Sequence, residues 1–273
     1  MPSRRADQAL VEERLAPSLE AARAFIMEGR VYQGEERLDK PSDPVKPGLT
    51  LFVREGRPFV SRGAHKLMGA LESFSLDVRD AVCLDVGSST GGFTDVMLRR
   101  GARCVYAVDV GYGLLDWRLR SDPRVTVMER TNARFLKPEM FPEPPEFGAT
   151  DVSFISLTQV LPAALRVLGG DWRFVALIKP QFEAPRNKVG PRGVVRDPAV
   201  HREVIERVAV CVASLGFRAA ALDFSPITGP EGNVEFLLGI DRRKDLAQGI
   251  DDARIGAVVP AAYDKFMKSP DSP

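Results

Sequence analysis

The sequence has few residues of the two types that most often hold metals or form disulfides. Its three cysteines, Cys83, Cys104 and Cys211, lie far apart in apolar segments and form no Cys-x-x-Cys pair. We therefore expect free thiols in a reducing cytoplasm and no disulfide framework. The two histidines, His65 and His201, have no partners at the spacing of metal ligands, so we expect no structural or catalytic metal such as zinc.

Long apolar runs and an excess of one charge are also missing. The N-terminus has no apolar signal core. The uncharged stretch 152–165 contains Ser, Thr, Gln and Pro and is too short to span a bilayer. The 38 basic and 37 acidic residues leave a net charge of +1. This balance gives no general attraction to membranes or nucleic acids, so a nucleic-acid surface has to be a local patch.

Two regions with different patterns follow one another along the 273 residues. Residues 1–55 read as two helices followed by short strands interrupted by Pro41, Pro44 and Pro47, which is too small a unit for an enzyme. We expect a small N-terminal α+β domain at 1–55, a linker at 56–62 and a larger α/β domain at 63–268.

The larger region alternates apolar strands with helices. The predicted strands are 81–86, 104–108, 125–128, 149–153, 174–178, 218–224 and 235–240, and the main predicted helices are 63–74, 92–100, 157–168 and 198–215. Such alternation predicts a doubly wound, mostly parallel sheet. The last two strands are separated only by residues 225–234, too few for a crossover helix, so they should pair antiparallel. The expected sheet has seven strands, one of them reversed.

A glycine-rich loop follows the first of these strands. Residues 84–95 read Leu-Asp-Val-Gly-Ser-Ser-Thr-Gly-Gly-Phe-Thr-Asp, a strand, a turn and a helix N-terminus, where a nucleotide-like ligand meets bare backbone. The glycines do not follow the Gly-x-Gly-x-x-Gly dinucleotide pattern, because serines stand where a pyrophosphate needs glycine. A nucleoside without phosphates tolerates them. The candidate cofactor-binding residues of this loop are Asp85, Gly87, Ser88, Ser89, Gly91, Gly92 and Phe93.

A second acidic residue supports this interpretation. Asp109 ends the second strand, where a carboxylate can accept hydrogen bonds from ribose hydroxyls. Asp85 can accept from an ammonium group or order the loop. The alternative is an ordinary strand–turn–helix whose glycines serve packing, and the position of Asp109 favours the cofactor site over it.

With these residues the sequence resembles class I S-adenosylmethionine-dependent methyltransferases. More closely, it resembles the TlyA-type ribosomal RNA 2'-O-methyltransferases, often labelled haemolysin-like. The matching segments occur in family order at 61–67, 83–95, 107–113, 129–134, 151–156, 179–183 and 232–236. The resemblance implies a Rossmann-like, FtsJ-like catalytic domain that uses S-adenosylmethionine. It also places Asn132 and Ala133 beside the adenine ring, although Asn132 equally suits a turn.

The same resemblance implies a Lys-Asp-Lys-Glu catalytic tetrad at Lys66, Asp151, Lys179 and Glu235. The expected topology agrees with it. Asp151 falls within the fourth predicted strand, Lys179 ends the fifth and Glu235 begins the last. Ligand crevices in open α/β sheets lie at the carboxyl ends of parallel strands, and a reversed last strand brings its N-terminal end to that edge. Lys66 lies on the helix before the first strand and can reach over this edge.

The tetrad suits transfer to a ribose hydroxyl, which is a poor nucleophile and has to lose its proton. We expect Lys179 to be the base. A second lysine and partial desolvation favour its neutral form, whereas the acidic partners oppose it. Asp151 would orient Lys179 and the hydroxyl, and Glu235 would hold Lys66 against the ribose oxygen. In-line placement of oxygen, methyl and sulfur should supply much of the rate. Phe154 is expected either under the cofactor or in the core.

Two segments are candidates for RNA binding. Residues 1–55 resemble the S4 RNA-binding domain, although Leu19 stands where such domains usually carry an arginine. The loop 184–196 has four basic residues and no acid, and we interpret it as a mobile loop that grips phosphates; the alternative is a merely solvated loop. The candidate RNA-binding residues are Arg4, Arg5, Arg23, Arg30, Arg62, Arg186, Lys188 and Arg192.

Taken together, the sequence predicts a cytoplasmic ribosomal RNA 2'-O-methyltransferase, which by resemblance acts on cytidine. Its partners would be ribosomal RNA or ribosomal subunits, with no membrane and no metal, and its oligomeric state is open. One alternative is a methyltransferase for another RNA position. A second is a membrane-acting haemolysin, for which no apolar span or strongly amphipathic helix is found. A third is an RNA-binding protein with an inactive catalytic domain, against which the intact tetrad argues.

Overall fold

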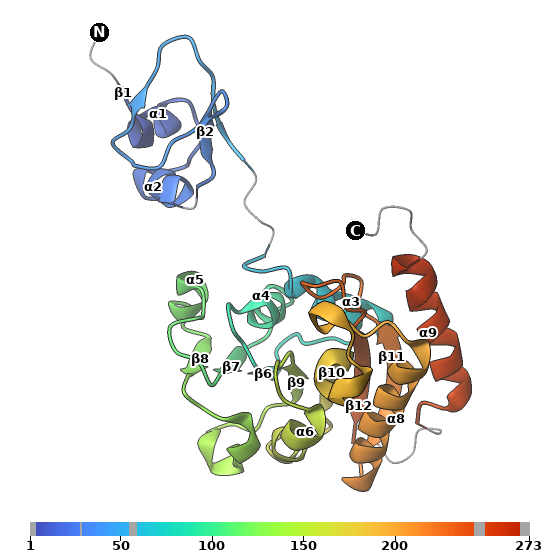
Figure 1. Ribbon diagram of the computed structural model, residues 1–273. Helices are drawn as coiled ribbons and strands as arrows, with labels where there is room; N and C mark the ends of the chain where they lie inside the picture. Colours follow the sequence, from blue (N-terminus) through green and yellow to red (C-terminus); the bar gives the residue numbers. More distant parts are fainter. Residues whose placement is uncertain (1–3, 28, 55–58, 243–248, 268–273) are drawn as a thin grey trace. The chain divides into compact units, whose positions relative to one another are not determined.

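The chain folds into two compact units, and the boundary along the chain lies between Phe59 and Val60. The computed structural model describes residues 4–27, 29–54, 59–242 and 249–267 (Figure 1). The predicted linker 56–62 straddles this boundary. Its residues 56–58 lie outside the described residues, as does residue 268, the predicted end of the second domain. Those domain bounds stay predictions.

The N-terminal unit is a small α+β module. It contains α1 (Ala6–Glu12) and α2 (Leu19–Met27), with β2 (Val31–Gln33) paired antiparallel to both β3 (Glu36–Arg37) and β5 (Leu51–Val53). A further ribbon pairs β1 (Arg4–Arg5) with β4 (Pro44–Val45). The hydroxyl of Ser18 accepts the N–H of Ala21 at 3.2 Å and so caps α2. The small core contains Leu10, Ile26 and Val31, each at most 1% exposed.

The second unit, as far as the described residues show it, is built on a seven-stranded sheet with the order β11-β12-β10-β9-β6-β7-β8. Its strands are β6 (Val82–Val86), β7 (Cys104–Val108), β8 (Val125–Met128), β9 (Phe147–Thr150), β10 (Arg173–Ile178), β11 (Arg218–Phe224) and β12 (Phe236–Asp241). β12 runs antiparallel to both of its neighbours, and the other pairs from β10 to β8 are parallel. The predicted mixed sheet with one reversed strand is confirmed.

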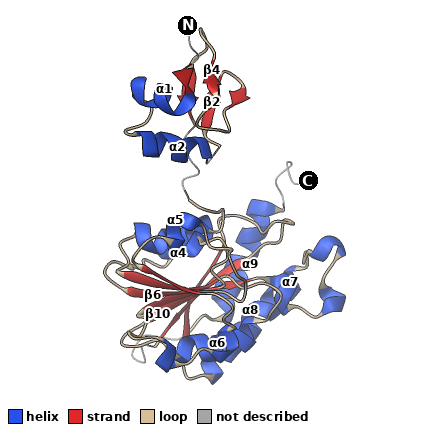
Figure 2. Cartoon of the chain, turned by 90° about the vertical axis from the view of Figure 1, so that its left-hand side faces the viewer, coloured by secondary structure: helices blue, strands red, loops and turns tan. Residues whose placement is uncertain are grey.

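Helices cover both faces of this sheet, with α4 (Gly92–Arg99) and α5 (Trp117–Arg120) on one side (Figure 2). On the other side lie α6 (Leu157–Arg166) and α8 (Pro198–Ser214). This double cover explains why all five residues of β6 are buried. The remaining helices are α3 (Ala64–Ser73), which contacts α4 and β12, the short α7 (Pro180–Glu183), and α9 (Asp252–Phe266), which packs on α8 and β11.

Two features differ from the sequence prediction. The fourth strand is Phe147–Thr150, so it ends before Asp151 rather than running through 153. The N–H of Asp151 still donates to the carbonyl of Val86 at 3.0 Å, after which the chain turns away and Phe154 takes a φ of 63°. The helix α9 was not predicted. It begins at the cap Asp251, whose carboxylate accepts the N–H of Arg254 at 2.7 Å.

Candidate active site

The predicted cofactor loop joins β6 to α4 and depends on its glycines. Gly87 and Gly91 have φ values of 82° and 95°, a left-handed conformation that favours glycine. A Cβ on Gly91 would lie 2.2 Å from the Cδ1 of Leu119, and one on Gly92 would lie 2.3 Å from the hydroxyl of Ser61. The protein's own packing therefore requires both glycines. The contacts of Gly87, Ser88, Ser89, Gly91 and Gly92 with a ligand stay predictions.

Asp85 is fully buried at the end of β6 and holds the start of α4. Its Oδ2 accepts the N–H of Thr94 at 2.9 Å and the hydroxyl of Thr94 at 2.6 Å. Its Oδ1 is buried and has no hydrogen-bond partner among the described residues. Because burial penalises the charged carboxylate, the pKa of Asp85 rises to about 7. Because Oδ1 has no partner in the described part of the chain, it suits a ligand that carries a positively charged donor such as an ammonium group.

Asp109 ties the second strand to the same loop. Its Oδ2 accepts the N–H of Ser89 at 2.8 Å and its Oδ1 accepts the N–H of Gly111 at 2.7 Å. Each carboxylate oxygen has a second lone pair, so the group can order the loop and still accept from a ribose hydroxyl. Both functions are thus compatible with its position.

Two other predicted cofactor residues are engaged in the protein itself. The side chain of Asn132 accepts the N–H of Arg134 at 3.1 Å and caps a short 3-10 turn, the local use that sequence left open. Ala133 begins that turn and is 9% exposed. The ring of Phe93, in the first turn of α4, is only 3% exposed and packs inside the unit. Their contacts with a cofactor remain predictions.

The four residues of the predicted tetrad lie in contact at the carboxyl edge of the sheet. Lys66 comes from the first turn of α3, Asp151 follows β9, Lys179 follows β10 and Glu235 precedes β12. The Nζ of Lys66 lies 2.6 Å from Oε2 of Glu235 and 3.9 Å from Oδ2 of Asp151. The Nζ of Lys179 lies 2.5 Å from Oδ1 of Asp151. The charges therefore alternate along one chain of contacts from Glu235 to Lys179.

Burial makes this charge arrangement unusual. The side chain of Glu235 is 1% exposed, those of Lys66 and Lys179 about a tenth, and that of Asp151 a fifth. Burial raises the pKa of Glu235 more than the nearby Lys66 lowers it. Ion pairs removed from water rarely repay their desolvation, which makes a group of four charged side chains in one place a candidate for function rather than stability.

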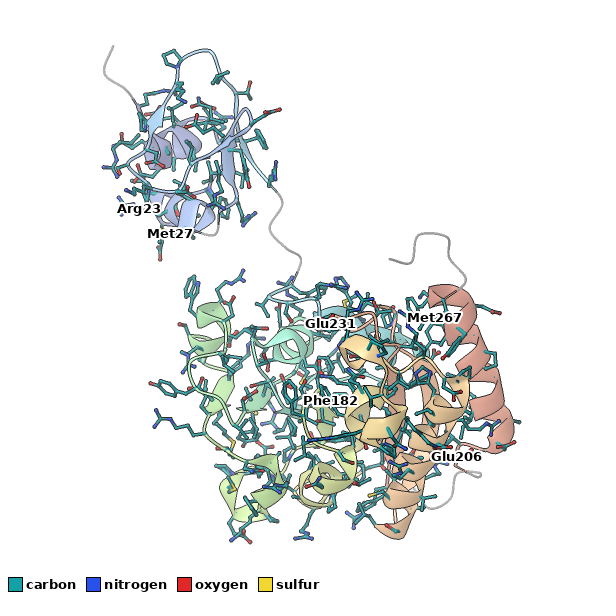
Figure 3. All side chains as sticks on the ribbon, viewed as in Figure 1. Arg23, Met27, Phe182, Glu206, Glu231 and Met267 are labelled. Atoms are coloured by element: carbon teal, nitrogen blue, oxygen red, sulfur yellow. The ribbon has the colours of Figure 1, made fainter. Side chains whose placement is uncertain are left out.

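Two residues near Lys179 differ from the prediction, Ser153 in its hydrogen bond and Phe154 in its exposure. The hydroxyl of Ser153 accepts a hydrogen bond from the Nζ of Lys179 at 2.9 Å. Phe154 is 91% exposed, so it does not lie in the core, and its contact with a cofactor stays a prediction. Its ring lies 4.9 Å from that of Phe182, which Figure 3 labels. Nothing local in the sequence distinguishes Ser153 from any other loop serine.

The predicted basic face of the N-terminal unit is partly neutralised. Arg4 pairs with Glu13 at 2.9 Å, while Arg5 and Arg23, the latter labelled in Figure 3, both pair with Asp7 at 3.0 and 3.1 Å. Arg30 packs over the ring of Phe25. Arg62 is exposed at the start of the second unit. Composition indicates the arginines of this face but cannot show which acids lie beside them.

The basic loop contains more structure than its composition suggested. Short 3-10 turns form at Arg186–Lys188 and Pro191–Gly193. The side chain of Asn233 accepts the N–H of Val195 and donates to the carbonyl of Gly193, both at 3.0 Å. Lys188 pairs with Glu203 on α8 at 2.8 Å. The loop is thus fixed at one end to the segment that carries Glu235, and its exposed Arg186 and Arg192 face solvent.

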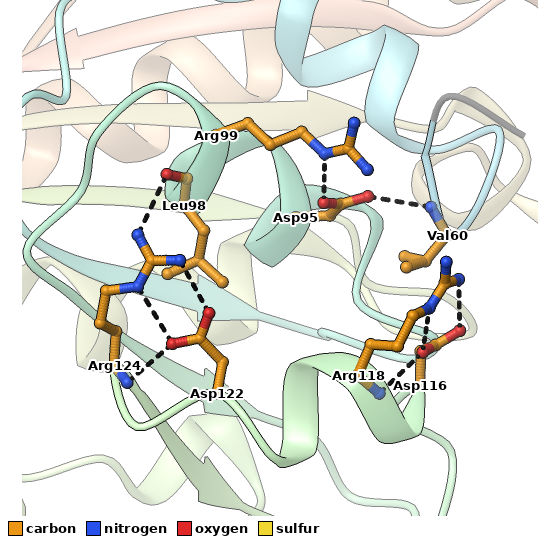
Figure 4. A network of polar contacts seen from close by, with 8 residues as sticks. All are labelled: Val60, Asp95, Leu98, Arg99, Asp116, Arg118, Asp122 and Arg124. Carbon is orange, nitrogen blue, oxygen red and sulfur yellow. Dashed lines mark hydrogen bonds and ion pairs between the residues drawn. The ribbon is translucent and has the colours of Figure 1, made fainter. Parts of the chain in front are cut away.

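The start of the second unit is fixed beside the cofactor loop. The N–H of Val60 donates to Oδ2 of Asp95 on α4 at 3.0 Å, and Arg99 donates to Oδ1 of the same carboxylate at 2.6 Å (Figure 4). The hydroxyl of the next residue, Ser61, lies so close to Gly92 that a Cβ at that position would be 2.3 Å from it. Residues 60–61, predicted as linker, therefore pack against α4.

Two kinds of feature are absent from the described residues. In ranges 4–27, 29–54, 59–242 and 249–267, no helix is both long and apolar enough to cross a membrane. The same part of the chain holds no group of three or more His, Cys, Asp or Glu side chains that could hold a metal ion.

Comparison with known proteins agrees with this geometry. A family model described as the S4 domain matches residues 4–51, and one described as FtsJ-like methyltransferase matches residues 59–242. A Bacillus subtilis protein named YqxC, a candidate rRNA methyltransferase, is 51% identical over 86% of this chain and 84% of its own. The 16S/23S rRNA (cytidine-2'-O)-methyltransferase TlyA of Mycobacterium tuberculosis is 45% identical over 91% of this chain and 95% of its own.

A solved structure is similar over almost the whole chain. A candidate hemolysin from Streptococcus thermophilus has 43% identity and a TM-score of 0.74, covering 98% of both chains. The FtsJ-like match spans the seven-stranded sheet and the tetrad, and the S4 match spans the N-terminal unit. The chain therefore belongs to the FtsJ-like methyltransferase family and is a methyltransferase whose Rossmann-like catalytic domain follows an S4 domain.

Proposed function

We propose that this methyltransferase transfers a methyl group from S-adenosylmethionine to a ribose 2'-hydroxyl of ribosomal RNA, with cytidine as the modified nucleotide. The observation that carries the proposal is the contact between Lys66, Asp151, Lys179 and Glu235 at the sheet edge next to the cofactor loop. The relative TlyA, named for cytidine 2'-O-methylation of 16S and 23S rRNA, supports the choice of substrate.

The residues of the cofactor loop would hold the methyl donor. The Oδ1 of Asp85, unpartnered among the described residues, suits its ammonium group, Asp109 suits its ribose, and the glycine-rich loop leads into the N-terminus of α4. When bound, S-adenosylmethionine supplies an electrophilic methyl group on a sulfonium sulfur. Asn132 and Ala133, in the turn after β8, would border the adenine.

The tetrad would prepare the hydroxyl. Lys179 takes the proton of the 2'-hydroxyl, and Asp151, 2.5 Å from its Nζ, fixes the direction of that nitrogen together with Ser153. Glu235 keeps Lys66 in place, so that its ammonium group donates to the ribose oxygen as negative charge develops there. Holding the oxygen in line with the methyl group supplies a further share of the rate.

A methyl-transfer assay with separated ribosomal subunits tests this function. Subunits from cells that lack the gene are incubated with labelled S-adenosylmethionine and wild-type protein, Lys66→Ala or Lys179→Ala, and the labelled nucleotide is mapped. We expect a 2'-O-methylcytidine with the wild type and a loss of at least about 100-fold with Lys179→Ala, the usual contribution of a general base. Cofactor binding, measured by calorimetry, should be unchanged in that variant.

The control is Lys137→Ala, which removes an exposed lysine that is not part of the tetrad and should keep full activity. Full activity of Lys179→Ala would overturn the assignment of the base. Label on a base carbon or nitrogen would favour the alternative, a methyltransferase for another RNA position.

The S4 domain and the basic loop would bind the RNA, and the enzyme would then work in the cytoplasm, where ribosomes are found. Replacing Arg186, Lys188 and Arg192 by Gln should weaken RNA binding. For every phosphate that is no longer neutralised, the slope of log affinity against log salt should fall by about 0.7–0.9. Glu203→Gln makes the matched control, because it releases Lys188 from its ion pair and should strengthen binding. Binding that is unchanged across salt in the triple variant would contradict an RNA role for the loop.

A further inference from the structure

Glu183, the last residue of α7, is a buried carboxylate that the proposed reaction does not use. It is 7% exposed. Its Oε1 accepts the N–H of Leu157 and its Oε2 accepts the hydroxyl of Ser156, both at 2.7 Å. Burial raises the pKa of Glu183 more than these two bonds lower it. A buried acid with neutral donors is costly to keep, and a hydrophobic residue of the same size could fill the space.

Capping of α6 alone does not account for this acid. Ser156 already occupies the N-cap position of α6, and its hydroxyl oxygen accepts the N–H of Thr158 at 3.2 Å. Glu183 adds a second acceptor from a distant segment, so that the first turn of α6 is bound to the end of α7. The distinctive property of the contact is that it joins two loops.

These two loops carry the base and its partners. The loop 151–156 bears Asp151 and Ser153, and the turn 179–183 bears Lys179. They follow β9 and β10, which pair in parallel only as far as Thr150 and Ala176. Beyond that pair no described strand ladder connects the loops, and their relative position depends on side chains.

The side-chain contacts between the loops are few. The Nζ of Lys179 contacts Asp151 and Ser153, and the ring of Phe182 contacts Phe154. The first contact belongs to the reacting groups, whose hydrogen bonds change as a proton moves. The second involves a residue that is 91% exposed and has a φ of 63°, a strained conformation for a bulky side chain. Glu183 supplies a further contact, to Ser156 and Leu157, which is buried and takes no part in proton transfer.

The other end of Glu183 is fixed as well. Arg207 on α8 donates to its backbone carbonyl at 2.7 Å. The residue therefore connects the end of α7 to α6 through its side chain and to α8 through its backbone. Both helices pack on the same face of the sheet (Figure 2). The bonds of Glu183 therefore tie the Lys179 turn to α6 and α8.

We propose that Glu183 is a positioning residue that fixes the Lys179 turn against the Asp151 loop and thereby sets the geometry of the base. The proposal rests on the proposed function for its effect on rate. A displacement of about 1 Å at the reacting groups can cost on the order of 100-fold in rate. Removing the hydrogen bonds of Glu183 should therefore lower kcat without changing the binding of cofactor or RNA.

The test compares Glu183→Ala, Glu183→Gln and a matched cap variant, Asp251→Ala, in the full chain. Asp251 caps α9 through the N–H of Arg254 and belongs to no part of the site, so its variant shows what loss of an ordinary cap does. We expect kcat to fall at least about 10-fold in Glu183→Ala, with KM for RNA and cofactor affinity within about threefold of wild type. Glu183→Gln keeps the acceptor for Leu157 and should recover most of the rate. The pH–rate profile should shift in Glu183→Ala and not in Asp251→Ala.

A second measurement needs no methyl transfer. Reductive dimethylation of lysines with formaldehyde, followed by mass spectrometry, reports how well Lys179 is held, with the exposed Lys137 as internal reference. Glu183→Ala should make Lys179 react several times faster, whereas Asp251→Ala should not. If the wild type methylates no RNA but this change in labelling occurs, the proposed function fails and the positioning role stands.

Unchanged labelling of Lys179 together with unchanged kcat in a folded Glu183→Ala protein would overturn the proposal. A kcat decrease that Asp251→Ala reproduces would do the same, because it would reflect stability alone. If Glu183→Ala does not fold, Ser156→Ala decides: it removes one of the two bonds to Glu183. Faster labelling and a lower kcat in that variant support the role, and wild-type values refute it.

Discussion

Each unit of the chain has an aspartate at most 1% exposed, Asp7 in the N-terminal unit and Asp85 in the catalytic unit, and burial has opposite outcomes for the two. Asp7 in the N-terminal unit is 1% exposed and pairs with Arg5 and Arg23, and these contacts, that with Arg5 first, lower its pKa to about 2. Asp85 in the catalytic unit is 0% exposed and accepts only from Thr94 among the described residues, so burial raises its pKa to about 7. Burial alone therefore does not decide the charge of an acid; the donors brought to it do.

The ion pairs of the two units also differ in how far their side chains are exposed to water. The pair Arg4–Glu12 of the N-terminal unit has side chains that are 50% and 58% exposed, whereas in the pair Lys66–Glu235 they are 9% and 1% exposed. Water solvates the first pair in the folded and unfolded states alike, but the second only after unfolding. The catalytic unit thus buries both partners of an ion pair where its chemistry needs charges, whereas in the described pairs of the N-terminal unit at least one partner stays exposed.

The largest effect should come from breaking the buried pair. Glu235→Ala leaves Lys66 buried with Asp151 at 3.9 Å as its nearest acid, and should destabilise the catalytic unit by about 3–5 kcal/mol. Both tryptophans, Trp117 and Trp172, belong to this unit, so urea unfolding followed by their fluorescence measures it in the full chain.

Glu12→Ala breaks the exposed pair and serves as the matched variant. It should leave the fluorescence transition in place and alter the hydrogen exchange of α1 only slightly. Equal losses of stability in the two variants would remove the contrast between buried and exposed pairs.

The next effect is a pH dependence due to Asp85. Its pKa is about 7 in the folded state and near 4 when unfolded, so the folded state holds its proton more tightly. The stability that this proton contributes is complete below pH 4 and is lost as pH rises through 7, at about 1.4 kcal/mol per pH unit. Asp85→Asn should remove this slope.

Urea midpoints of the wild type and Asp85→Asn between pH 5 and pH 8 test the slope. The wild type should lose stability relative to the variant as pH rises. Parallel curves would mean that Asp85 is ionised throughout this range and that the two aspartates do not differ as proposed.

The smallest effect should be that of Asp7. Because its pKa is lowered to about 2, its contribution to stability is present above pH 4 and is lost as pH falls through 2. The side chains of Arg5 and Arg23 are about half exposed, so solvent screens much of the interaction. Hydrogen exchange of α1, compared between wild type and Asp7→Asn, should show faster exchange in the variant at pH 5 and no difference near pH 2. A difference that persists at pH 2 would point to packing rather than charge.

Much of the fold followed from local patterns. Apolar runs bounded by turns placed the seven strands within a few residues, and the short connection 225–234 correctly predicted the reversed pairing of β12. The helix α9 was missed because Gly256 and Pro260 suggest a break. Its buried residues Ile255, Val258 and Val259 have helical spacing, and that periodicity was the better signal.

The site was predictable by type but not by contact. The glycine loop and four charged residues could be named from sequence, since their identities follow the chemistry and the resemblance. The end of β9 before Asp151 could not, because the residues on either side favour a strand equally. The exposure of Phe154, the pairing of Arg5 with Asp7 and the contact of Glu183 with Leu157 each depend on segments distant in the chain. Such facts arise only when the loops pack.

The position of β12 has a consequence for folding of the enzyme during its synthesis. β12 is synthesised after the other six strands of the described sheet, yet it lies between β10 and β11 and brings Glu235 to Lys66. A nascent chain that has left the ribosome only as far as β11 has Lys66 without Glu235, and β10 and β11 without the strand that joins them. Such late, long-range closure slows folding. The four charged residues of the site can therefore meet only after β12 has been made, so a chain that ends at β11 has no complete tetrad.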